Sequence, residues 1–117
     1  MRRRWLLLAS VMLLGAAPQP TATLTWSAPA NPVGVPSLLA YDVVRTVDVP
    51  DFVNQTCPVP CATCVPPFNT NQTTLTDPAI PMNGQVFYYL VRAENPCGEG
   101  SLGVNSTGTP TPGRSCP

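Results

Sequence analysis

The chain has 117 residues, with six arginines, six acidic residues, no lysine and no histidine, so its formal net charge is zero. This length allows one domain. The lack of histidine excludes Ser-His-Asp and Cys-His catalytic sites and a histidine general base. We therefore expect neither an enzyme nor a cofactor. A chain without a basic cluster is also a poor candidate for binding nucleic acid.

The N-terminus has the layout of a secretory signal peptide. Three arginines at positions 2–4 precede an apolar run at 5–14, and small residues follow at 15–17. The apolar run is shorter than the roughly 20 residues that a membrane-spanning helix needs. We predict that residues 1–17 are removed, leaving a chain without a membrane span. This mature chain would be secreted to the extracellular space, the cell surface or the periplasm, and its net charge would be −3.

Short alternating segments separated by turn residues predict strands and no helix. Strands are expected at 22–29, 40–46 and 73–76, with a weaker one around Phe52 and Val53. The 16 prolines favour loops and strand edges. Many short strands separated by turns indicate an all-β fold, either a sandwich or a barrel.

The most informative segment is 87–106, which predicts a β-hairpin. Residues 87–94 alternate as a strand, Asn95-Pro96 ends it, and Gly98 and Gly100 allow the chain to reverse into a second strand at 101–107. Tyr88 and Leu90 would project from the face opposite the core, where they either form a candidate patch for a partner or pack against a neighbouring strand or domain.

The pattern Tyr-x-Val-x-Ala-x-Asn-x-x-Gly, which begins at Tyr89, resembles the last two strands of a fibronectin type III domain. Leu-Thr-Trp-Ser-Ala-Pro at 24–29 and Tyr-Asp-Val-Val-Arg at 41–45 resemble its second and third strands. The resemblance implies an immunoglobulin-like β-sandwich over residues 18–109, followed by a Pro/Thr/Gly-rich tail at 110–117. It also places Tyr89 at a tyrosine corner, with its ring in the core and its hydroxyl bonding back to the chain. The expected core residues are Trp26, Tyr41, Val43, Tyr89 and Val91.

The first strand of that family has no counterpart before residue 22. Either the strand is missing or the chain is a fragment of a larger surface protein. The strand around Trp26 would then present an unpaired edge to which another chain adds a strand. The resemblance implies a non-catalytic module for adhesion, for binding a protein or carbohydrate ligand, or for spacing. Its loops at 31–36, 58–67 and 96–100 would carry any binding.

Five cysteines, Cys57, Cys61, Cys64, Cys97 and Cys116, are expected to form disulfides in an exported chain and to leave one thiol unpaired. Two metal sites are the alternatives. The first three have the C-x3-C-x2-C spacing by which radical S-adenosylmethionine enzymes hold an iron–sulfur cluster, and with Cys97 they could bind zinc. Fifteen arrangements of two bridges are possible. The fibronectin-like arrangement favours Cys97 with Cys64 or Cys61, while Cys116 could pair with Cys97 if the tail folds back.

Overall fold

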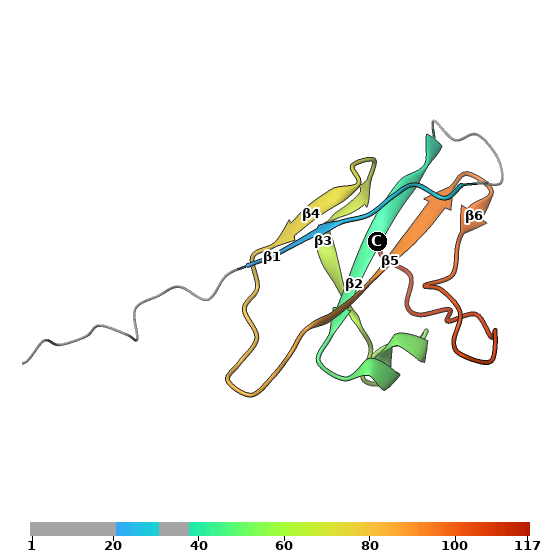
Figure 1. Ribbon diagram of the computed structural model, residues 1–117. Helices are drawn as coiled ribbons and strands as arrows, with labels where there is room; N and C mark the ends of the chain where they lie inside the picture. The colour runs from blue at the N-terminus through green and yellow to red at the C-terminus, as the bar shows by residue number, and fades with distance from the viewer. Residues whose placement is uncertain (1–20, 31–37) are drawn as a thin grey trace, which may run out of the picture.

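The computed structural model describes residues 21–30 and 38–117, so the predicted signal peptide and the loop at 31–36 lie outside the described residues. Within these described residues, six strands form two antiparallel sheets (Figure 1). The two-stranded sheet joins β1 (Ala22–Thr25) to β4 (Thr74–Asp77). The four-stranded sheet has the order β3-β2-β5-β6, formed by Thr63–Thr70, Ala40–Thr46, Tyr88–Asn95 and Gly98–Glu99. The fold is therefore all-β.

The two sheets pack together through the inner face of the four-stranded sheet, which carries Val43 and Val65. These two side chains are buried, and they form one cluster with Leu75 of β4. Leu24, Trp26, Tyr89 and Val91 are partly buried against the same cluster. Tyr41 is also buried, and its ring meets that of Trp26 edge to face with 5.5 Å between centroids. The five residues expected in the core thus lie on facing sides of the two sheets.

A second apolar cluster covers the outer face of the four-stranded sheet, the face on which Tyr88 and Leu90 were predicted to lie. Its buried members are Val44, Phe52, Ala62, Cys64 and Leu102, with Leu90 and Cys116 partly buried against them. Leu90 therefore packs inside the molecule, whereas Tyr88 remains exposed. Because both faces of the sheet are covered, β2 has almost no exposed side chain, as expected for a strand buried on two sides.

The segment around Phe52 and Val53 is a 3-10 helix, η2 (Val49–Val53), and the prediction of a strand there is wrong. Pro50 fixes its own backbone and has no N–H for a sheet ladder, so it suits the start of a helix. The N–H of Asp51 bonds to the Asp48 carbonyl at 2.9 Å and closes the turn. Phe52 then points into the outer cluster.

Strand β3 was not predicted, and it contains Pro66-Pro67. The structure places these prolines in an edge strand, where the missing N–H groups cost least. The Pro66-Pro67 peptide is cis, and the register between β2 and β3 shifts between Tyr41 and Val43.

The last hairpin is shorter than expected. Its turn is Pro96-Cys97, β6 has two residues, and 101–107 forms no strand beyond one bridge between Val104 and Pro110. The N–H of Gly100 bonds to the Ala93 carbonyl, and a Cβ at Gly100 would lie 2.8 Å from that oxygen. Glycine is thus required at position 100, where the chain leaves β6, because of this close approach.

Candidate functional site

The cysteines lie at disulfide distance in two pairs, Cys57 with Cys61 and Cys64 with Cys116, whose Cα atoms are 6.1 and 5.8 Å apart. Cys97 is free and exposed. The favoured bridge between Cys97 and Cys64 or Cys61 is therefore not the one formed. Cys64 lies opposite Val44 in β3, whereas Cys97 follows Asn95, past the opposite end of β2. Four residues along a strand span about 13 Å, which is too far for a disulfide.

The same geometry separates two of the loops that were expected to share one end. The turn at 96–97 follows the end of β5 that pairs with Ala40, whereas residues 57–62 precede Thr63, which pairs with Arg45 at the other end of β2. In Figure 1 the 3-10 helix and the β5–β6 turn accordingly lie at opposite ends of the sheet. A single binding surface made from both loops is excluded.

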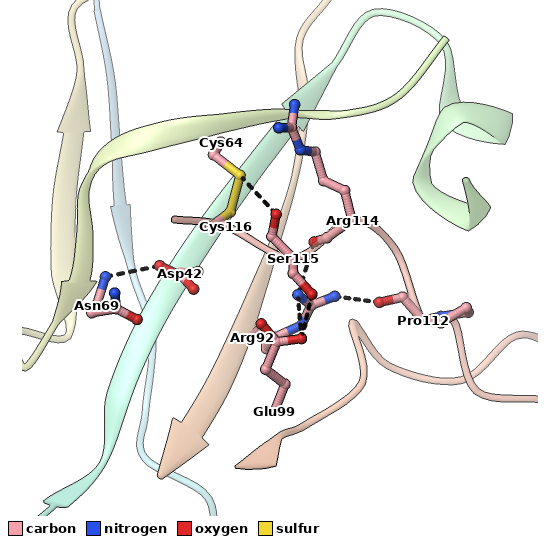
Figure 2. A network of polar contacts seen from close by, with 9 residues as sticks. All are labelled: Asp42, Cys64, Asn69, Arg92, Glu99, Pro112, Arg114, Ser115 and Cys116. Carbon is pink, nitrogen blue, oxygen red and sulfur yellow. Dashed lines mark hydrogen bonds and ion pairs between the residues drawn. A yellow bond between two sulfur atoms is a disulfide. The ribbon is translucent and has the colours of Figure 1, made fainter. Parts of the chain in front are cut away.

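Residues 110–117 pack on the outer face of the four-stranded sheet and do not form a separate tail. Arg92 of β5 is 1% exposed and holds this segment by donating to the carbonyls of Pro112 and Arg114, the latter at 2.8 Å (Figure 2). Its guanidinium also lies 3.5 Å from the half-exposed carboxylate of Glu99. A buried guanidinium needs such partners, because an unpaired buried charge is costly. The domain therefore extends beyond residue 109.

Two further carboxylates lie beside Arg92 on the outer face. Asp42 is 1% exposed and accepts a 2.8 Å bond from the N–H of Asn69, near the end of β3 (Figure 2). Glu94 lies two residues along β5 from Arg92. Burial, together with the negative charges of Asp42 and Glu99, raises the pKa of Glu94. Across the described residues no group of three or more His, Cys, Asp or Glu side chains is arranged to hold a metal ion.

A polar contact at Asp77 ties the two sheets together on the inner face. The carboxylate of Asp77, 1% exposed, accepts bonds from Arg45 at 2.6 Å, from the Tyr89 hydroxyl at 2.8 Å and from the N–H of Ala79 at 2.9 Å. The guanidinium of Arg45 also lies 4.6 Å from the ring centroid of Phe87, a cation–π contact. Tyr89 thus bonds to a side-chain carboxylate of β4. In a tyrosine corner, by contrast, the hydroxyl bonds to the backbone.

These contacts set the pKa values of both acids. Burial alone favours a higher pKa for Asp77, but the bonds from Arg45, Ala79 and Tyr89 outweigh it and lower the pKa. Burial and the Asp77 carboxylate raise the pKa of Tyr89 to about 12. The hydroxyl therefore stays a hydrogen-bond donor throughout the physiological range.

The lowered pKa of Asp77 predicts that acid weakens the fold. A group whose folded pKa lies below its unfolded value contributes stability above the unfolded pKa, and that stability is lost as the pH falls through the folded pKa. We expect Asp77→Asn to destabilise the protein at pH 7 and to lose this disadvantage progressively below about pH 4. Urea unfolding of both proteins at pH 7, 4 and 2.5 measures this. A difference that does not change with pH would contradict it.

The β5–β6 pocket is a hollow of about 390 Å³ at the inner face, beside the last hairpin. Its apolar lining comes from Pro29, Leu39 and Ala93, and its remaining wall from Glu94, Asn95, Cys97, Gly98, Glu99 and Gly100. The sequence indicates part of this site through the glycines of the hairpin. It gave no sign of Pro29, which lies in the segment after β1, or of Leu39, which directly precedes β2; the fold brings both beside the end of β5.

Within the residues that the structure describes, no helix has the length and apolarity needed to cross a membrane. A scan against protein-family models, a search of curated proteins and a search of solved structures found no match to this chain.

Proposed function

We propose that this protein is an exported fibronectin type III-like β-sandwich that acts as a non-catalytic module for adhesion, ligand binding or spacing in a surface or secreted assembly. The strand arrangement supports this proposal. The strand that resembles the family's second lies in the smaller sheet with β4. The strand that resembles the third, β2, pairs in the larger sheet with β5, which carries most of the pattern that resembles the family's last two strands. Both sheets are antiparallel, as such a sandwich requires.

The observation that carries the proposed compartment is the pairing of four cysteines. Two pairs at disulfide distance are typical of proteins that fold where thiols oxidise. A metal protein built on Cys57, Cys61 and Cys64 finds less support, because the sulfur of Cys64 faces Cys116 beneath the C-terminal segment while the other two pair with each other. The three sulfurs therefore do not converge on one ion.

An intact mass of the exported chain, measured after alkylation without reduction, tests the proposal. We expect a chain that lacks residues 1–17, is four hydrogens short and carries one alkyl group, at Cys97. A chain that stays inside the cell with several alkylated cysteines, or one that carries zinc or iron in its native spectrum, would overturn the proposed compartment and return the cysteine cluster to consideration as a metal site.

A further inference from the structure

Strand β1 has one paired edge and one open edge among the described residues, since its partner is β4. The N–H of Trp26 bonds to the carbonyl of Thr73, directly opposite it, at 3.0 Å. In an antiparallel pair, bonded and non-bonded residues alternate. The N–H and C=O groups of Thr23 and Thr25 must therefore point away from β4, toward the open edge.

This edge lacks the features by which proteins prevent strand addition. Edge strands are usually protected by charged side chains, by proline or by a bulge. Residues 21–30 contain no charged side chain, and their first proline is Pro29, after the strand has ended. The β1–β4 register also runs without a shift from Ala22 to Thr25. Within residues 21–30 and 38–117, no strand therefore pairs with the backbone at this edge.

The larger sheet extends beneath the open edge. β4 contacts β3, so β1 lies on the side of β2 and β5, and its open edge faces β5 and β6 (Figure 1). The inner-face side chains of β5, Tyr89, Val91 and Ala93, are only partly buried there, whereas Val43 of β2 is 1% exposed. The β5–β6 pocket continues this uncovered surface at its far end. One more strand beside β1 fits above this surface.

The same arrangement favours one kind of partner at the open edge of β1. In each copy, the four-stranded sheet projects past the β1 edge. A second folded copy that paired through its own β1 would therefore bring its β5 and β6 against those of the first copy. A single extended segment avoids this collision. An uncharged edge above an apolar surface favours a segment without charges, since an unpaired charge there would lose its water.

We propose that an uncharged, extended segment of a second protein adds to β1 as an antiparallel strand, pairs with the backbone of Thr23 and Thr25, and lays alternate apolar side chains over Val91, Ala93 and the β5–β6 pocket. This inference rests on the proposed binding role and names the chemistry of its partner. Main-chain pairing supplies affinity in such β-augmentation, and the pocket supplies selectivity for alternate side chains.

The test titrates the ¹⁵N-labelled exported chain with the synthetic peptide acetyl-Thr-Val-Thr-Val-Thr-Val-amide and follows backbone amide exchange. We expect the amides of Thr23 and Thr25 to exchange at least about tenfold more slowly at saturation, and those of Thr74 and Thr76 to remain unchanged. A peptide with N-methyl groups on alternate residues, and one with the same composition in the order Val-Val-Val-Thr-Thr-Thr, should bind at least about tenfold more weakly.

Two proline variants form a matched pair. Thr23 and Thr76 are exposed partners whose hydroxyl oxygens lie 2.9 Å apart, so either substitution loses the same bond, and each N–H points to an outer edge of the small sheet. Thr23→Pro should abolish binding and Thr76→Pro should retain it.

Each other result overturns the proposal. Absence of binding at millimolar peptide, equal binding of the N-methylated peptide, and binding that survives Thr23→Pro would all do so. Protection of the Thr23 and Thr25 amides in the free monomer would mean that this chain fills its own edge. A dimer lost only in Thr23→Pro would assign the edge to a second copy. None of these outcomes alters the mass that tests export, so failure of this inference and failure of the proposed function can be told apart.

Discussion

Replacing Cys116 with alanine is expected to lower the free energy of unfolding by about 4 kcal/mol, because the Cys64–Cys116 bridge closes a loop with a sequence separation of 52. In the chain-entropy model such a crosslink acts mainly by restricting the unfolded chain. Cys64 stays in place as a small buried apolar side chain, so the outer cluster keeps its packing. Urea unfolding under non-reducing conditions measures the loss, which would be a large share of the stability of a domain this size.

The matched control is Cys61→Ala, which opens a loop with a sequence separation of only 4. The same model gives about 2 kcal/mol for that loop. Both variants should be made in a Cys97→Ser background, so that the exposed thiol cannot exchange with the bridges. Equal losses in the two variants, or a Cys116→Ala protein as stable as its parent, would show that the C-terminal segment is not fastened to β3 in solution.

The second large effect is expected at Arg92. Arg92→Met should cost about 3 kcal/mol, because it keeps the length of the side chain but leaves the carbonyls of Pro112 and Arg114 without their charged donor. Trypsin digestion, followed by mass spectrometry, should show earlier cleavage after Arg114, the one tryptic site in the last ten residues. Urea unfolding gives the magnitude.

Glu99→Gln separates the two kinds of partner that Arg92 has. Glu99 is 37% exposed and lies 3.5 Å from the guanidinium, so its contribution should stay below about 1 kcal/mol. A loss at Glu99→Gln as large as that at Arg92→Met would show that the ion pair, and not the carbonyl contacts, fixes the C-terminal segment.

Local patterns predicted the strands well where one cause decided the structure. Residues 40–46 form a strand with the predicted bounds. The strands predicted at 22–29 and 87–94 are β1 and β5, although β1 already ends at Thr25 and β5 is shifted by one residue. The predictions failed where the structure of a segment depends on residues far away in the sequence. Pro66-Pro67 is tolerated because β3 is an edge strand, and no local pattern shows which strand will be an edge.

Parts of the candidate site could be anticipated from the sequence and parts could not. The glycines of the last hairpin followed from turn residues, and the unpaired edge near Trp26 was an expectation that the family resemblance implied. The pairing of Cys64 with Cys116 could not be foreseen, because it depends on residues 110–117 crossing the outer face. The same crossing explains why Arg92, which alternation placed merely opposite the core, is buried.

The double coverage of β2 has a consequence for how its register is chosen. In a strand with one wet face, a slip by one residue exposes the apolar set and is rejected on that ground. In β2, Val43 and Val44 are both buried, so a slip by one residue would move each valine to the other buried face and would expose neither. Discrimination against misalignment must therefore come from the charged positions. Arg45 reaches Asp77 only from the inner face, and Asp42 receives the Asn69 N–H only from the outer one. These two polar contacts therefore select the register of β2.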